Sequence, residues 1–535
     1  MTAFDCDITR YWYGPTMRLP CRFPDCGVIA AVGLLIVVAL PTPAPGRNGQ
    51  LQLTVTDRES GKAIPCRMHL QSANGKPRKA EKLPFWNDHF VLPGRVALSL
   101  PVGNYTFEIE RGPEYVFRGG HFTINDFADD ARQIDLFRFV DMAGEGWWSG
   151  DLDVRRSPEE IELLMLADDL HVVPLVTWWN RENPWKAKPP ADVLVRFDGN
   201  RYCHLMAGGH ARDGGSLLYF NLPAPLLLDT NDPEYPPPTH FIERARQTPD
   251  AWIDVTRPYW WDLPMLVAHG QVDSIQILHG QICRDRVLED EAEAKPRDKT
   301  LFPGPWGNAL WSQAIYFHLL NCGLRIPPTA GSGSGISPNP LGYNRVYVAV
   351  EGEFDYRSWW QGLAAGRVFV TNGPLLKPSV AGHPPGHVFR ADQGGEIDLE
   401  IGLTLWNRHP ADAKESIHYL EIIQDGRIEH SVRFEQYANS GKLPKLHFDQ
   451  SGWFLVRAVT DVSQTYRCAM TGPYYVEIGE RPRISKASAQ FFLDWIYERA
   501  RRLKIDYPDR HREVLQQHRQ ARDWWQDRLE RATAD

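Results

Sequence analysis

A chain of 535 residues is longer than one ordinary folded core requires, so about three or four domains are expected. Its 43% hydrophobic and 24% charged residues are typical of a soluble globular protein. The formal net charge of −8 argues against the basic surface of a nucleic-acid-binding protein, and we expect no nucleic-acid partner.

The long apolar stretch of the chain covers residues 27–40 (GVIAAVGLLIVVAL). At about 14 residues it is short for a transmembrane helix and typical of the apolar region of a signal peptide. Arg18 and Arg22 precede it, and a proline-rich segment follows at 41–46. Residues 1–46 are therefore expected to be a signal peptide or, because prolines crowd the cleavage region, an N-terminal membrane anchor. Either alternative places the rest of the chain outside the cytoplasm, in the periplasm or the extracellular space.

The cysteines that follow this segment are odd in number and widely spaced: Cys66, Cys203, Cys283, Cys322 and Cys468. They show neither the paired spacing of a zinc site nor the density of a disulfide scaffold. Buried free thiols are expected, with one long-range disulfide as the alternative.

Residues 47–140 alternate apolar and polar side chains in short runs, at 51–56, 95–100 and 105–110. Turn-forming residues separate the runs, which predicts a β-sandwich. Residues 101–107 (PVGNYTF) resemble the P-x-G-x-Y strand start of carboxypeptidase-regulatory-like β modules. Such modules are usually structural, and we assign no chemistry to this region.

Residues 146–155 (GWWSGDLDVR) begin a region, 141–375, in which strands alternate with helices. In a strand over 151–155 the side chains of Asp151, Asp153 and Arg155 share one face. Three ionisable groups on one face indicate either a structural ion pair or a site.

A helix is predicted over 158–169, capped by Ser157 with Glu160 completing a capping box. Strands are predicted at 172–177, 216–220, 251–255 and 272–278, and a helix at 309–322. Repeated units of this kind predict an α/β barrel or a layered sheet, with chemistry at the carboxyl ends of the strands. The glycine-rich segment 331–335 lacks the Gly-Lys-Ser/Thr of a phosphate loop and is predicted to be an irregular surface loop.

Residues 376–482 return to strand patterns, at 396–401, 417–423 and 453–459, and predict a second β-sandwich. The tail, 483–535, predicts an amphipathic helix with Phe492 and Trp495 on its apolar face. Arg499, Arg501 and Arg502 of this tail are expected on a solvated face, with a role at a membrane surface as the alternative.

Segments 146–155 and 169–180 (DLHVVPLVTWWN) together resemble the metallohydrolases of the CehA/McbA type, and 366–374 (GRVFVTNGP) and 451–458 (SGWFLVRA) add to the resemblance. It spans roughly residues 144–480. It implies a PHP (polymerase and histidinol phosphatase-like) barrel, which in the family holds two or three metal ions with His, Asp and Glu ligands.

Most of the family's ligand motifs are altered in this chain. Where the family has Gly-Asp-x-His-x-His, Asp151 is kept but the His positions hold Asp153 and Arg155. The remaining departures are Trp178 and Trp179 in place of Asp-His, Arg257 in place of the His of a His-Pro, residues 332–335 in place of Ser-Asp-x-His, and 206–210 in place of a Gly-Glu-Glu motif. Losing so many ligands should abolish a polynuclear metal site.

The residues that remain could form a sparser site. The catalytic candidates are Asp151, Asp153, His171 and His210, and the ligand-binding candidates are Arg155, Trp178, Trp179, Asp254, Arg257 and His279, with Asp273 as a further carboxylate. No cofactor is expected, and a single divalent metal is the alternative. The arginines favour an anion or internal pairing with Asp153 and Asp254, and Trp178 and Trp179 favour an aromatic mouth for a small-molecule or carbohydrate ligand.

Three functions follow from this interpretation. The first is an exported protein with a metallohydrolase-like fold and a degenerate metal centre, serving in binding or as a scaffold. The second is an active hydrolase of ester or phosphoester bonds with a single metal ion that activates water. The third is a polysaccharide-binding protein that uses its tryptophan pairs. An ion pair between Arg155 or Arg257 and Asp153 or Asp254 would favour the first over the second.

Overall fold

The computed structural model describes residues 48–228, 230–407, 416–479 and 482–535. The expected signal peptide or anchor, 1–46, lies outside these residues. Across the described part of the chain, no helix combines the length and the apolar character needed to cross a membrane. The fold is a mixed α/β structure with several sheets and a helical C-terminal region, as the sequence predicts at this level.

Two sheets form the first β region. Their strands are β1 (Asn48–Asp57), β5 (Arg95–Pro101), β7 (Tyr115–Val116) and β9 (Asp129–Arg138) in one sheet, and β2 (Cys66–Ser72), β3 (Phe85–Trp86), β4 (His89–Leu92), β6 (Gly103–Glu110) and β8 (Arg118–Ile124) in the other. Alternate residues of β1, such as Leu51 and Leu53, are buried in a core to which both sheets contribute. The Tyr105 hydroxyl donates to the Pro101 carbonyl at 2.8 Å, which fixes the turn into β6. The predicted strands of this region are confirmed.

A row of seven hydrogen-bonded strands builds the central region. In order they are β10 (Trp147–Gly150), β11 (Val172–Trp179), β13 (Arg201–Arg212), β14 (Gly215–Phe220), β15 (Trp252–Val255), β16 (Ser274–Leu278) and β17 (Pro328–Ala330). Neighbours in the row run parallel except at β14, which is antiparallel to both β13 and β15. A short strand, β12 (Leu194–Phe197), is added to β13.

The two ends of this row meet through the segments that follow β10 and β17. The Leu152 amide donates to the Ala330 carbonyl at 3.1 Å, and the Arg155 amide donates to the Ser334 carbonyl at 2.8 Å. Val154 forms parallel bridges with both Leu175 and Ser334. The seven strands and these extensions therefore form a closed ring, which we call the strand ring.

The same sheet continues beyond the strand ring into the trailing β region. From β10 it passes through β18 (Arg345–Ala349), β19 (Val368–Thr371), β28 (Cys468–Thr471), β27 (Gly452–Thr460), β24 (Ile417–Gln424) and β25 (Arg427–Arg433). The other strands of this region are β20 (Leu375–Val380), β21 (Val388–Ala391), β22 (Ile397–Leu399), β23 (Ile401–Trp406), β26 (Leu446–Phe448) and β29 (Tyr474–Ile478). Together with β24 and β27 they enclose a core around Leu420 and Phe454, to which Trp147 of β10 also contributes. Hydrogen bonding of the sheet is thus continuous across the boundary placed at residue 375.

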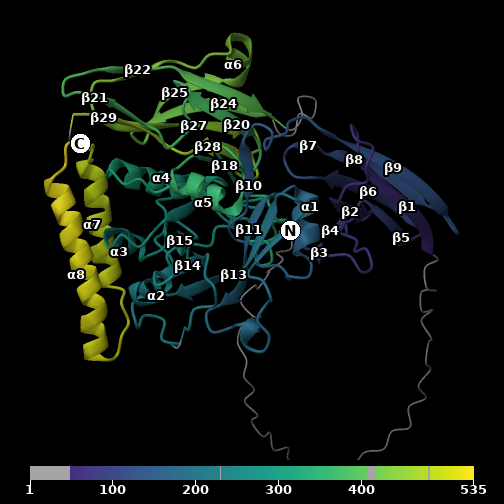
Figure 1. The fold of residues 1–535 in the computed structure, drawn as a ribbon, viewed down its shortest axis with the longest axis horizontal. Helices are drawn as coiled ribbons and strands as arrows, with labels where there is room; N and C mark the ends of the chain where they lie inside the picture. Colours follow the sequence, from purple (N-terminus) through teal and green to yellow (C-terminus); the bar gives the residue numbers. More distant parts are fainter. Residues whose placement is uncertain (1–47, 229, 408–415, 480–481) are drawn as a thin grey trace, which may run out of the picture. The chain divides into compact units, whose positions relative to one another are not determined.

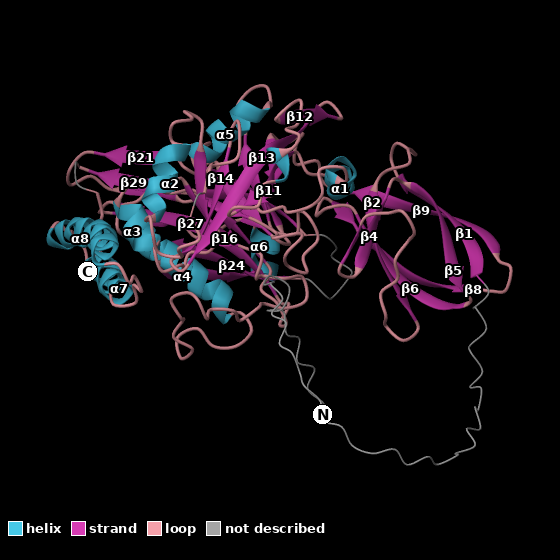
Figure 2. Ribbon diagram, turned by 90° about the horizontal axis from the view of Figure 1, so that it is seen from below, coloured by secondary structure: helices cyan, strands magenta, loops and turns pink. Residues whose placement is uncertain are grey.

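Most of the helices lie beside the strands of the central region, and the outer strands of the first β region carry none (Figures 1 and 2). The helices are α1 (Ile161–Asp168), α2 (Pro238–Ala245), α3 (Leu263–Ala268), α4 (Gly307–Asn321), α5 (Tyr356–Ala364), α6 (Phe434–Ser440), α7 (Lys486–Ala500) and α8 (Pro508–Glu530), with a 3₁₀ turn at Pro184–Lys186. The capping box predicted for α1 is wrong. The Ser157 hydroxyl bonds the Glu159 carboxylate and Glu160 pairs with Arg156, so neither side chain caps the helix, which begins at Ile161.

The predicted helical tail consists of two helices, α7 and α8, which lie side by side (yellow in Figure 1). Both also contact α3, and α7 contacts α4. Trp495 and Trp525 are fully buried in the core that these helices share with the strand ring. Arg499 is buried in ion pairs rather than solvated, which corrects the expectation for that residue. The tail is therefore an integral part of the helical layer.

Candidate functional site

Asp151 follows β10 and is fully buried. Its Oδ1 accepts hydrogen bonds from the amides of Asp153 at 3.2 Å and Ser332 at 2.9 Å, and its Oδ2 accepts one from the Gly342 amide at 2.7 Å. Burial raises its pKa to about 7, against the lowering effect of these donors. The carboxyl group therefore ties three backbone segments together, and both of its oxygens are engaged.

Asp153 and Arg155 form the internal ion pair that the sequence left open. Nε of Arg155 lies 2.9 Å from Oδ1 of Asp153. The guanidinium carbon of Arg155 lies 3.6 Å from the ring centroid of Trp179, a cation–π contact. Gly331 packs so closely on this pair that a Cβ there would lie 2.6 Å from the Cβ of Asp153. The guanidinium group of Arg155 thus lies directly beside the carboxylate of Asp153, where a metal ion bound by Asp153 would have to lie.

Asp254, at the carboxyl end of β15, is surrounded by side-chain donors. Ser274 Oγ lies at 2.5 Å, Thr329 Oγ1 at 2.6 Å and Gln276 Nε2 at 2.7 Å. Burial raises the pKa of Asp254 to about 7, and the charge of Asp153 adds to this effect. Asp254 is thus fully buried in the strand ring, and its carboxyl group accepts hydrogen bonds from three side chains.

Arg257 and His279 lie beyond the ends of β15 and β16. The Arg257 guanidinium carbon lies 4.8 Å from the ring centroid of Trp260, and no ion pair within the described ranges includes it. Nε2 of His279 lies 3.0 Å from Ser312 Oγ, while its Nδ1 has no hydrogen-bond partner in the part of the chain that is described. Burial lowers the pKa of His279 well below its usual range, so this imidazole is neutral.

The other candidates have separate partners. His171 has its Nδ1 3.0 Å from Ser149 Oγ, and His210 meets the Phe241 ring edge-on at 4.7 Å. Burial lowers the pKa of both histidines to about 3. Asp273 accepts from the Ile253 amide and pairs with Arg246.

Among the described residues, two groups of His, Cys, Asp and Glu side chains are close enough to share a metal ion, and neither contains any of the candidates above. The structure therefore does not bring Asp151, Asp153, His171 and His210 together as a ligand set.

The aromatic mouth expected from Trp178 and Trp179 is corrected in part. Trp178 is 2% exposed, and its indole nitrogen donates to the Met206 carbonyl at 3.1 Å within the core. Trp179 is half-buried beneath Arg155. Each described tryptophan is buried or half-buried, so these residues do not offer the exposed stacking platform that polysaccharide binding would use.

Two further expectations concern the glycine-rich segment and the cysteines. Residues 331–334 are buried between the extension of β10 and β16, so the prediction of a surface loop is wrong. Gly331 packs directly on Asp153 and Gln276, which leaves no room for a side chain, and Gly333 and Gly335 have positive φ angles. The five described cysteines are buried free thiols, as expected.

Sequence reasoning missed the two ligand groups, which lie in the first β region and share His69. One contains His69, Asp88 and His89, and the other contains His69, Glu108 and Glu110. Nδ1 of His69 and Nδ1 of His89 each lie 3.1 Å from an oxygen of Asp88. His69 and His89 are directly opposite each other in the pairing of β2 with β4. That register, which the sequence does not specify, brings them together.

The protonation states of the first group suit metal binding. Burial lowers the pKa of His89 to about 3, and it also lowers that of His69. Burial tends to raise the pKa of Asp88, but its hydrogen bonds from the two histidines outweigh this and hold it well below its usual range. Neutral imidazoles and an ionised carboxylate are the forms that bind metals. In the second group Arg284 already pairs with Glu108 and Glu110.

No family model matches the chain, and no curated protein does. A solved structure of the Bacillus anthracis TIE protein is 17% identical over 21% of this chain and 19% of its own, with a TM-score of 0.15. A structure of fibronectin(III)-like modules of Clostridium thermocellum CbhA is 16% identical over 26% of this chain and 62% of its own, with a TM-score of 0.12. This chain thus spans less than two thirds of either, and neither similarity supports a conclusion about fold or function.

Proposed function

We propose that the chain is an exported protein with a PHP-like barrel of the CehA/McbA type whose metal centre is degenerate, and that it binds a small-molecule or carbohydrate ligand or acts as a scaffold rather than as a hydrolase. The observation that carries the proposal is the ion pair between Arg155 and Asp153 at 2.9 Å. Both residues stand at positions where the resemblance places histidine ligands.

The surroundings of this pair support the proposal. A divalent ion beside Asp153 would have to displace the Arg155 guanidinium or lie next to it, and like charges at such distances repel strongly in a buried site. Asp151 and Asp254 would also have to give up three hydrogen bonds each. The residues present here do not fit a polynuclear metal centre. The closed, largely parallel strand ring with helices outside it is compatible with the barrel part of the resemblance.

Restoring the two altered histidine positions tests this proposal. The variant carrying Asp153→His and Arg155→His should show no metal-dependent hydrolysis of phosphodiester or ester substrates in Mn²⁺, Zn²⁺ or Fe²⁺, because the later ligand positions are also altered. The wild-type protein and an Arg357→His variant, changed on the exposed side of α5, are the matched controls. If the double variant gained metal-dependent hydrolysis, the proposal that the metal centre has lost several of its ligands would be contradicted.

A single divalent metal remains a second proposal, at His69, Asp88 and His89 rather than in the strand ring. Its support is the proximity of three ligand atoms and a buried Nε2 on His69 that lacks a hydrogen-bond partner among the described residues. Two imidazoles and one carboxylate are a ligand set that zinc accepts. Hydrolysis by this metal is the corresponding alternative function. A His89→Gln variant should lose any stoichiometric ion that the wild type retains.

A further inference from the structure

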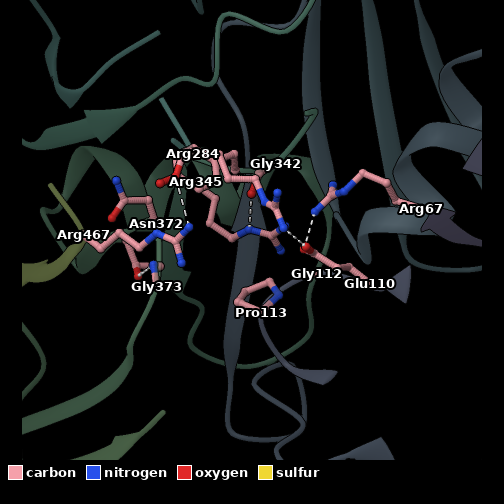
Figure 3. A pocket seen from close by; sticks show the side chains of 12 residues that line it. Arg67, Glu110, Gly112, Pro113, Arg284, Gly342, Arg345, Asn372, Gly373 and Arg467 are labelled. Atoms are coloured by element: carbon pink, nitrogen blue, oxygen red, sulfur yellow. Dashed lines mark hydrogen bonds and ion pairs between the residues drawn. The ribbon is translucent and has the colours of Figure 1, made fainter. Parts of the chain in front are cut away.

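Four arginines from separate parts of the chain converge on one cavity (Figure 3). Arg67 belongs to β2, Arg284 follows β16, Arg345 begins β18 and Arg467 precedes β28. The cavity offers about 40 Å³ to the centres of water molecules. One water needs roughly 10–15 Å³ in the same measure. The space therefore suits a few waters or one small oxyanion.

The carboxylates near the cavity pair with Arg67 and Arg284. Glu110 is the one acid among the described lining residues, and it accepts from Arg67 at 2.8 Å and from Arg284 at 2.6 Å. Arg67 and Arg284 have one further carboxylate partner each, Asp168 and Glu108 respectively. All three carboxylates thus bond to Arg67 or Arg284, and the ion pairs found within the described ranges do not include Arg345.

Arg345 is the arginine of the four that most needs an anionic partner. It is 2% exposed, its Nε donates to the Gly342 carbonyl at 2.7 Å, and its Nη2 donates to the Asp168 carbonyl at 3.2 Å. Its buried Nη1 has no hydrogen-bond partner in the described part of the chain. Nη1 lies beside Gly112, a cavity residue, where an added Cβ would be 3.4 Å away. A buried cationic donor without an acceptor is unfavourable, and an anion in the cavity would supply one.

The opposite side of the cavity is lined by Arg467 and the loop after β19. Arg467 is 7% exposed, and its Nη2 donates to the Arg284 carbonyl at 3.1 Å. Gly373 of that loop also lines the cavity, and a Cβ added to it would touch nothing closer than the Cβ of Arg467 at 3.8 Å. Arg467 therefore adds a further guanidinium group to the lining of the cavity.

We propose that this cavity is a binding site for a small oxyanion, either free phosphate or the phosphoryl group of a phosphate monoester. Planar guanidinium groups match the geometry of phosphate oxygens and bind them through charge-assisted hydrogen bonds. The site joins the first β region, the strand ring and the trailing β region through one anion. It does not depend on the state of the metal centre.

The test is calorimetric titration of the whole protein with inorganic phosphate and, separately, with glycerol phosphate, both at constant ionic strength set with chloride. Binding of both anions would show that the cavity accepts the phosphoryl group of a phosphate monoester as well as free phosphate. Binding of inorganic phosphate alone would identify the free anion. Arg345→Gln and Arg467→Gln should each weaken binding about tenfold or more, because each removes a charged hydrogen-bond donor. Arg297→Gln, which removes a buried guanidinium from outside the cavity, should leave binding unchanged.

Two substitutions at Gly373 give a second test that does not remove an arginine. Gly373→Asp adds a carboxylate at the cavity and should raise the unfolding temperature in phosphate-free buffer while abolishing phosphate binding. Gly373→Asn has the same size without the charge and should do neither. The proposal is overturned if neither anion binds beyond chloride, or if phosphate binds equally well to the Gly373→Asp and Gly373→Asn variants.

Discussion

The carboxyl group of Asp254 lies among three side-chain donors, and burial raises its pKa from 3.8 to about 7. Between these pH values the folded state keeps a proton that the unfolded state has released. The stabilising contribution of the protonated form is therefore complete below about pH 3.8, and it is lost as the pH rises toward 7. At neutral pH this residue reduces the stability of the strand ring.

An Asp254→Asn variant should consequently be more stable than the wild type at pH 8, and the difference should shrink at pH 5. Between pH 5 and pH 8 the wild type should lose on the order of 2 kcal/mol more free energy of unfolding than the variant does. Urea unfolding at both pH values measures this. Asp250→Asn, which changes an exposed carboxylate of the same segment, is the control. A difference independent of pH would show that the Asp254 carboxyl group does not titrate in this range.

Sequence patterns predicted some of the candidate side chains well and others poorly. Strand alternation placed Asp153 and Arg155 on one face, and the structure has them paired. The same alternation could not show that Trp178 faces the helical core, because that depends on which side of β11 the helices cover. His171 and His210 were grouped with the aspartates by resemblance, yet each has its own partners.

Helix α7 is held to the strand ring by a buried cluster of charges. Arg499 lies 2.5 Å from Glu234 and 2.7 Å from Asp262, and all three side chains are buried. Removing the cation from such a cluster leaves two carboxylates buried without compensation. The tail helices therefore depend on this one arginine in addition to the apolar contacts of Trp495 and Trp525.

We expect Arg499→Met to lower the free energy of unfolding by about 3–5 kcal/mol, the range for breaking a buried ion pair. Arg501→Met, two positions along and exposed, should change it by less than about 0.5 kcal/mol. Chemical denaturation followed by tryptophan fluorescence compares the two variants. Equal effects would indicate that the cluster adds no stability to the attachment of α7.

Local patterns explain which secondary-structure elements could be predicted. Alternating apolar residues located β1 closely, because one of its faces is buried. Nearly continuous apolar runs located β11, β14 and β27, because these strands are buried on both faces. A helix was predicted for the tail, 483–535, without a break, whereas the structure interrupts the helix at 501–507 and restarts it at Pro508, a residue suited to a helix start. The pairing of β2 with β4 that brings His69 opposite His89 is a long-range register, which local periodicity does not encode.

The buried histidines set the pH response of the described chain as a whole. Burial lowers the pKa values of His89, His171 and His210 to about 3, and those of His204 and His318 to about 4. An imidazole whose folded pKa lies below its ordinary value of 6.5 gives full stability above that value, and this is lost as the pH falls toward the folded pKa. Acids whose pKa values burial raises act in the opposite direction, and among them Asp151 and Asp254 have pKa values of about 7, within the range in which histidines titrate. The histidines with lowered pKa values outnumber these acids.

The free energy of unfolding should therefore be lower at pH 5.5 than at pH 7.5, by on the order of 2 kcal/mol. Thermal and urea unfolding at these two pH values and equal ionic strength provide the measurement. A protein that became more stable on acidification would contradict the dominance of neutral buried histidines.

A degenerate metal centre would bind no metal ion at Asp153 in the strand ring. The most direct measurement is elemental analysis after incubation with Zn²⁺ or Mn²⁺ and dialysis, on the wild type, on Asp153→Asn and on His89→Gln, with folding of each checked by circular dichroism. Our account predicts that Asp153→Asn leaves the metal content of the wild type unchanged, and that any stoichiometric ion disappears with His89→Gln. Loss of a bound ion in Asp153→Asn, with retention in His89→Gln, would place the metal in the strand ring and contradict the account.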